Sequence, residues 1–351
     1  MSPGDTVDPM ELTPRRQALI VGAVAVIVIG VLTQASLLFT TDATKVAAFT
    51  LAFAGLSLLT HHLGLLSLGQ GAMVGIGAVA GLHAVRDFGL PPTLIPLAGL
   101  AAGFLLGAII AVPSLRLPKP YLALLTLSVA VAVPIVIRQL DGPLPVTLDA
   151  EYLPPSWTGI DERDEHQWEF IIVVAWVLPT LWILHRLLRG PVGRAFIASR
   201  DDPAAAAAFG IPVRRLRLFG VALSGGLAGM AGGLTVVPVN ITDSPLYPES
   251  LSIKMFAVAV AFGGQRVLSA IPSAAFLILL PVWLGDRNWV VPSGWEGLLK
   301  SEGFIYAVLL LATAHFTKGK GFTHLLGERR RARRLGLANA PLFTFQRYRL
   351  K

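Results

Sequence analysis

The feature that most constrains this chain is a set of long apolar runs without charge, the first of which extends from Ala18 to Phe39. A run of this length is what a helix needs to cross roughly 30 Å of hydrocarbon. It is too long for the core of a signal peptide, and no small-residue cleavage site follows it soon, so we interpret it as a retained span. Because 54% of the residues are hydrophobic and 14% are charged, one soluble core could not bury the apolar surface. The sequence therefore predicts an integral membrane protein.

Ten apolar segments are candidate membrane spans. They cover residues 18–39, 46–59, 71–85, 92–112, 121–137, 170–184, 218–239, 251–262, 268–284 and 304–316. Several are shorter than the roughly 17–25 residues that a straight span needs, so we expect them to be tilted or broken, or to enter and leave on one side. The sequence thus predicts an all-α polytopic membrane protein with about 8 to 10 transmembrane helices.

The charges between these segments predict their orientation, because loops rich in Lys and Arg stay in the cytoplasm. The loop 139–167 holds many acidic residues and the single basic residue Arg163, so it can lie outside, whereas 185–217 and the tail are rich in arginine and belong inside. Ten alternating crossings place both termini in the cytoplasm. We therefore expect a cytoplasmic segment 1–16, a transmembrane domain 17–317 with a cytoplasmic loop at about 189–214, and a basic cytoplasmic tail 318–351.

A short helix is expected within this cytoplasmic loop, in the stretch "SRDDPAAAAAFGI" at residues 199–211. The alanine run to Phe209 is a strong helix former, Pro203 suits a first helical turn, Asp201 or Asp202 can cap the N-terminus, and Gly210 can end the helix. From the residues alone the loop is either a connector whose arginines meet anionic lipid or a functional segment.

Motifs for catalysis or cofactor binding are not found. Neither "GPVGRAF" nor "KGKGF" has the spacing of a phosphate-binding loop, and the chain has no cysteine for thiolate chemistry. His61 and His62 lie about 100° apart on a helix, and no set of His, Asp and Glu shows metal-ligand spacing. We therefore expect no enzyme activity, no metal, no cofactor and no nucleic-acid partner.

Glycines are abundant within the apolar segments, in "LSLGQGAMVGIGAVAG" and in "LSGGLAGMAGG". They indicate close helix packing or, less commonly, helices that break inside the membrane. Ionisable residues in the spans are scarce, with Lys254 near the start of one segment and Arg138 at the end of another, which argues against an ion-coupled carrier.

Four segments together resemble one family. They are "GLSLLTHHLGLLSLGQGAMVGIGAVAG" (55–81), "RLPKPYLALLTLSVA" (116–130), "GPVGRAFIASRDDPAAAAAFGIPVRRLRLFGVALSGGLAGMAGGL" (190–234) and "LSIKMFAVAVAFGG" (251–264). In this order they resemble the membrane subunits of branched-chain amino-acid ABC importers of the LivM type. The resemblance extends from about residue 45 to about residue 320.

The resemblance implies a permease that moves a branched-chain amino acid, or a related amide or carboxylate, into a bacterial cell across the inner membrane by alternating access. It implies as partners two cytoplasmic ATPase subunits, a homologous second permease subunit and an extracytoplasmic solute-binding protein. It places coupling to the ATPases at Gly193, Arg194, Ala195, Arg200, Asp201, Asp202, Ala205 and Gly210. Our candidates for the substrate pathway are Ser67, Gly69, Gln70, Tyr121 and Thr126.

This chain departs from the family pattern at several positions. Pro203 and Ala206 replace residues that are often acidic, which makes the coupling segment less charged, and Gln70 replaces a common histidine. Two other functions stay open at this point. One is an ion-coupled secondary carrier of a small organic solute. The other is a membrane protein that binds anionic lipids through "GERRRARRLG", where each basic residue near the membrane surface contributes about 1 kcal/mol to the binding.

Overall fold

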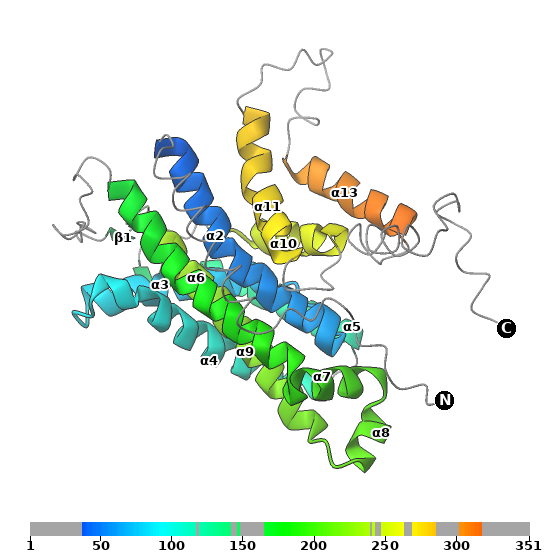
Figure 1. Ribbon diagram of the computed structural model, residues 1–351. Coiled ribbons are helices and arrows are strands. Elements are labelled where there is room, and N and C mark those ends of the chain that lie inside the picture. Colours follow the sequence, from blue (N-terminus) through cyan, green and yellow to red (C-terminus); the bar gives the residue numbers. More distant parts are fainter. Residues whose placement is uncertain are drawn as a thin grey trace, which may run out of the picture.

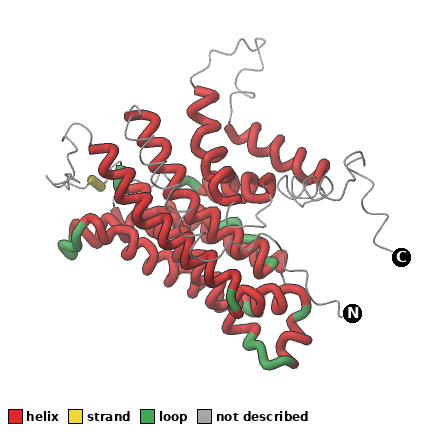
Figure 2. Tube along the Cα trace, in the orientation of Figure 1, coloured by secondary structure: helices red, strands yellow, loops and turns green. Residues whose placement is uncertain are grey.

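The computed structural model describes residues 37–116, 119–141, 146–147, 165–238, 241–242, 247–262, 269–285 and 302–317. Nearly all of these residues are helical (Figures 1 and 2). By length and composition, five of the described helices can cross a membrane, and two shorter apolar helices accompany them. The prediction of an all-α polytopic membrane protein is confirmed. The expected segments 1–16 and 318–351 and most of the first expected span lie outside the described residues.

The long helices are α2 (Leu37–Ser57) with the π-helix η1 (Leu58–Leu63) that continues it, α4 (Ile95–Ser114), α5 (Lys119–Asp141), α6 (Glu165–Arg189) and α9 (Val213–Val236). The shorter ones are α3 (Gln70–Arg86), the single turn η2 (Pro92–Leu94), α7 (Pro191–Asp201), α8 (Pro203–Ala208), α10 (Glu249–Phe262), α11 (Ala270–Gly285) and α13 (Glu302–Thr317). Nine of the ten expected spans thus correspond to a described helix.

One described helix begins well before the apolar segment that predicted it. That segment starts at residue 46, whereas α2 begins at Leu37 and runs through Asp42 and Lys45. The threonine hydroxyls of this region bond within the helix: Thr44 donates to the carbonyl oxygen of Thr40 and Thr50 to that of Val46, each at 2.8 Å. Because these polar groups have partners on their own helix, they do not interrupt it.

Helix α9 forms the centre of the bundle, and 89% of its most apolar stretch of 18 residues is buried inside the protein. Its most extensive contacts are with α4, then with α3 and α2. Backbones approach closely here: a Cβ atom on Gly229 would lie 2.2 Å from the carbonyl oxygen of Gly99 on α4, and one on Gly77 of α3 would lie 2.1 Å from that of Gly229. The glycine runs therefore serve close packing at this point, as the sequence indicated.

The two ends of the bundle differ in structure. Helices α7 and α8 lie together at the lower right of Figure 1, whereas the α3–α4 connection and β1 lie at the left. At that left end β1 (Val146–Thr147) pairs antiparallel with β2 (Ile241–Thr242), with Val146 opposite Thr242. Leu63 and Phe196 both contact the position of Gly220, so η1, α7 and the start of α9 meet at the α7–α8 end.

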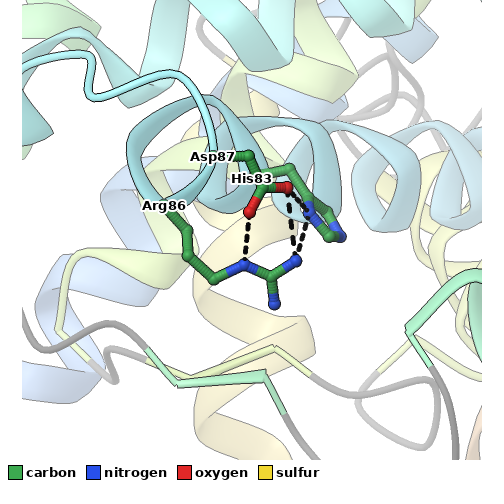
Figure 3. A network of polar contacts seen from close by, with 3 residues as sticks. All are labelled: His83, Arg86 and Asp87. Carbon is green, nitrogen blue, oxygen red and sulfur yellow. Dashed lines mark hydrogen bonds and ion pairs between the residues drawn. The ribbon is translucent and has the colours of Figure 1, made fainter.

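A polar cluster ends helix α3 at the opposite end (Figure 3). Nε of Arg86 donates to Oδ1 of Asp87 at 2.7 Å, and Nδ1 of His83 lies 2.6 Å from Oδ2 of the same carboxylate. Arg86, and after it His83, hold the pKa of Asp87 down at about 2. Gly89 follows with a φ of 63°, and its amide donates to the carbonyl oxygen of Val85, a left-handed ending that turns the chain toward α4.

Candidate functional site

The buried start of α3 brings together most of the residues predicted for the substrate pathway. Residues 64–69 form a non-helical link after η1, and α3 begins at Gln70, which is 0% exposed. The first amides of a helix have no partner within it and need other acceptors. Here the amide of Leu68 donates to Oγ1 of Thr126 at 2.9 Å, and that of Gly71 donates to Oγ of Ser252 at 3.0 Å. Side chains from α5 and α10 thus satisfy one amide just before α3 and one in its first turn.

Gln70 joins α3 to two other helices. Its Nε2 donates to the carbonyl oxygen of Ala52 on α2 at 3.2 Å, and to the carbonyl oxygen and Oγ of Ser224 on α9 at 3.3 Å each. Oγ of Ser224 in turn donates to the carbonyl oxygen of Gly55 at 2.8 Å. These acceptors fix the orientation of the amide and leave Oε1 of Gln70 buried with no hydrogen-bond partner in the described part of the chain.

Close packing surrounds this polar cluster. A Cβ atom on Gly69 would lie 2.8 Å from the carbonyl oxygen of Thr126, and Ser67 is 2% exposed with its Oγ 3.4 Å from the amide of Gly69. Ser67, Gly69, Gln70 and Thr126 therefore lie together. Tyr121 does not join them, since it is 57% exposed near the start of α5.

Two members of the cluster were not among the residues predicted from sequence. Ser224 opens the glycine-rich run of α9, and Ser252 lies in the fourth segment of the resemblance. Both segments were recognised, but nothing in the sequence indicates which of their hydroxyls face α3. That depends on the rotation of α9 and α10 about their axes, which packing decides.

The predicted coupling residues lie on α7, on α8 and at their ends. The inner face of α7 is formed by Gly193, Phe196 and Ser199, all buried. A Cβ atom on Gly193 would lie only 1.8 Å from the carbonyl oxygen of Leu188, so α7 is packed directly against the end of α6. Arg194 is exposed and Ala195 is half-buried.

Helix α8 is the short exposed helix that the sequence predicts. Of the two possible caps the structure selects Asp202, whose Oδ1 accepts from the amides of Ala204 and Ala205 at 3.0 Å each. Gly210 has a φ of 81°, in the left-handed region, and follows the end of the helix. Ala206 is buried, whereas the rest of the alanine run is exposed and Phe209 is 87% exposed. The helix therefore presents a small apolar surface away from the bundle.

Arg200 points toward the bundle. Its Nε donates to Oδ1 of Asp201 at 2.8 Å, and its Nη1 donates to the carbonyl oxygen of His61 at the end of η1. The charged groups of residues 200–202 are thus used within the chain, with Asp202 at the cap of α8 and Asp201 beside Arg200.

Comparison with known proteins identifies a family. The family described as "Branched-chain amino acid transport system / permease component" matches residues 38–313. The chain is 29% identical over 261 residues to the high-affinity branched-chain amino acid transport system permease protein LivM of Escherichia coli (strain K12) and equally to that of Salmonella typhimurium, covering 67% of this chain and 60% of each relative. It is 36% identical over 106 residues to the probable branched-chain amino acid transport permease protein LivH of Methanocaldococcus jannaschii, covering 30% of this chain and 32% of that relative. The chain thus spans about 60% of the length of the LivM relatives. No solved structure matches it.

Proposed function

The chain belongs to the family of permease components of branched-chain amino acid transport systems, and from this membership we propose that it is a permease subunit of an ATP-driven importer. It moves a branched-chain amino acid, or a related small amide or carboxylate, into the cell. The observation that carries the proposal is α8, a capped and exposed apolar helix between α6 and α9 at one end of the bundle.

The proposed complex contains two cytoplasmic ATPase subunits, a homologous second permease subunit and an extracytoplasmic solute-binding protein. It lies in a bacterial inner membrane with the α7–α8 end on the cytoplasmic side, where the arginines of 185–217 are expected. Both termini are then cytoplasmic, the transmembrane permease domain covers 17–317, and the basic tail 318–351 meets anionic lipids. ATP hydrolysis takes place on the partner subunits.

Coupling is proposed to use the segment that holds Gly193, Arg194, Ala195, Arg200, Asp201, Asp202, Ala205 and Gly210. Within it, the ATPase contacts the exposed side of α8. The alanines there are small and Phe209 projects from its end, so the contact is made by packing more than by charge. When the ATPase pair closes on ATP, α7 and α8 move with it, and the spans behind them rearrange between outward-open and inward-open states.

The substrate pathway is proposed to pass the start of α3, at Ser67, Gly69, Gln70 and Thr126. The unpartnered Oε1 of Gln70 supports this, since a buried acceptor without a donor is costly and would bind an amino group or a water that passes there. In the described structure Gln70 is fully buried among these helices. Opening then requires α2, α3 and α9 to separate around Gln70 and Ser224.

The proposal is tested by reconstitution. Genes for two ATPases, a second permease and a solute-binding protein are expected beside the gene for this chain. Their products are assembled with this chain, and the complex is placed in proteoliposomes. We expect ATP-dependent uptake of labelled leucine, isoleucine or valine, measured against a panel of ureas and organic acids. Uptake that proceeds without the ATPases and follows an imposed ion gradient would overturn the proposal in favour of a secondary carrier.

A further inference from the structure

The π-helix η1 meets the α7–α8 segment at its C-terminal end, although the two are about 140 residues apart in the sequence. The last carbonyl groups of a helix have no partner within it, and the helix end carries a partial negative charge. Arg200 supplies what this end lacks: its guanidinium donates to the carbonyl oxygen of His61. Arg200 therefore acts as the C-terminal cap of a helix to which it does not belong.

The contact between Arg200 and η1 is supported by a second charged group and by apolar packing. Asp201 accepts from Nε of Arg200, which orients the guanidinium and leaves Nη1 for His61. Beside it, the buried ring of Phe196 and the side chain of Leu63 pack against the same point on α9, Gly220, where an added Cβ would lie 2.4 Å from Cδ1 of Leu63. A charged hydrogen bond and apolar packing thus connect α7 to η1.

From η1 the chain reaches the Gln70 cluster by two routes. Forward, the π-helix ends at Leu63, Gly64 follows with a φ of 63°, and the link 64–69 leads directly to Gln70. Backward, η1 continues α2, whose carbonyl oxygens at Ala52 and Gly55 accept from Gln70 and from Ser224. At about 1.5 Å per residue, Gly55 lies only about 9 Å along the helix from His61. A π-helical segment is an irregularity that often accompanies a functional site.

We propose that Arg200 is a positioning residue that links the coupling segment to the substrate pathway by holding the end of η1. The proposal rests on the proposed function for its role in transport. It differs from a docking role, since the guanidinium faces its own chain. When α7 moves, Arg200 carries the end of η1 with it, and the hydrogen bonds of Gln70 to α2 and α9 change as a result.

The link is first tested on the purified chain without partners, by hydrogen exchange of the amides of residues 58–69. We expect Arg200→Gln to speed exchange in this segment by about three- to tenfold, because the end of η1 loses its cap. Arg200→Lys, which keeps the positive charge and more of the length needed to reach the carbonyl of His61, restores slow exchange in part. Arg215→Gln, at an exposed arginine on the first turn of α9, is the matched control and leaves exchange unchanged. Faster exchange confined to 191–210 in Arg200→Gln would overturn the proposal.

Its role in transport is tested on the reconstituted complex, with leucine as the probe. We expect the Arg200→Gln complex to retain its ATPases and to hydrolyse ATP, while the leucine moved per ATP falls about tenfold and Arg200→Lys recovers most of it. An unchanged ratio, or loss of the ATPases from the complex, would show that Arg200 does not act through η1. If the wild-type complex moves no branched-chain amino acid, the proposed function and this role both fail, whereas hydrogen exchange still decides whether the link exists.

Discussion

Helices α9 and α8 are both built from small residues, and they use them in opposite ways. In α9, glycines allow the backbones of α3 and α4 to come so close that an added methyl group would overlap them. In α8, alanines have almost no neighbours, and only Ala206 is buried. Small residues therefore do not indicate one role. Within the bundle they allow contact between helices of the same chain, and at its end they leave most of a short helix exposed.

The largest loss of stability is expected from a substitution at the centre of α9. Gly229→Ala places a Cβ atom 2.2 Å from the carbonyl oxygen of Gly99 and 2.8 Å from Cα of Gly103, so α4 must move. We expect a loss of about 1–3 kcal/mol in the free energy of unfolding, measured by denaturant titration in detergent. Gly226→Ala is the control on the same helix: its nearest atoms, the carbonyl oxygen of Leu100 and Cβ of Phe104, lie at 3.3 Å, so an adjustment of a few tenths of an ångström is enough. Equal losses in the two variants would contradict the close packing at Gly229.

A smaller effect is expected where polar groups join α9 to α3. Ser224→Ala removes the hydroxyl that donates to Gly55 and accepts from Gln70. Gln70→Leu removes the amide that donates to this hydroxyl. Hydrogen bonds between membrane helices average about 0.6 kcal/mol, so we expect a coupling energy of that order in a double-mutant cycle. Strictly additive losses would show that the two side chains do not interact.

In α8 the expected effect is local. Asp202→Ala removes a cap that accepts from two amides, which costs the helix about 1 kcal/mol. Hydrogen exchange of residues 204–209 should become faster, while the midpoint of global unfolding stays the same because α8 is exposed. Asp202→Asn keeps a capping oxygen and should leave exchange slow. A lower global midpoint in Asp202→Ala would mean that α8 is part of the cooperative core.

The smallest effect on stability is expected at Phe209. Its side chain is 87% exposed, so Phe209→Ala should change the free energy of unfolding by no more than about 0.5 kcal/mol. Under the proposed function the same change weakens the copurification of the ATPase subunits. Full ATPase recovery with Phe209→Ala would remove this residue from the proposed contact and place the docking surface elsewhere on the segment.

Much of the fold could be predicted from local patterns. Apolar length predicts the spans, and Asp202, Pro203 and Gly210 predict the start and end of α8, because caps and left-handed endings are local properties of the backbone. Apolar length alone does not give the start of α2. The helix begins at Leu37, before the apolar segment 46–59, and the hydroxyl of Thr44 in this polar stretch bonds within the helix.

The residues of the candidate site were also predicted only in part from the sequence. Segments that resemble the family contain Ser67, Gly69, Gln70 and Thr126, and the structure brings all four together. Tyr121 comes from the same pattern, yet it lies on the exposed side of α5. A motif predicts which segment takes part, but the rotation of each helix decides which of its side chains face the site.

By itself, the sequence determined that this chain is a helical membrane protein with a capped helix between α6 and α9, since hydrophobic length, charge and capping are read within a few neighbouring residues. Tertiary structure alone decided that Arg200 caps the end of η1 and that Ser224 and Ser252 bond to α3. These contacts join residues 139, 154 and 181 positions apart. Such pairs form only after the helices pack, because each joins two elements far apart in the sequence and no local preference of the chain brings them together.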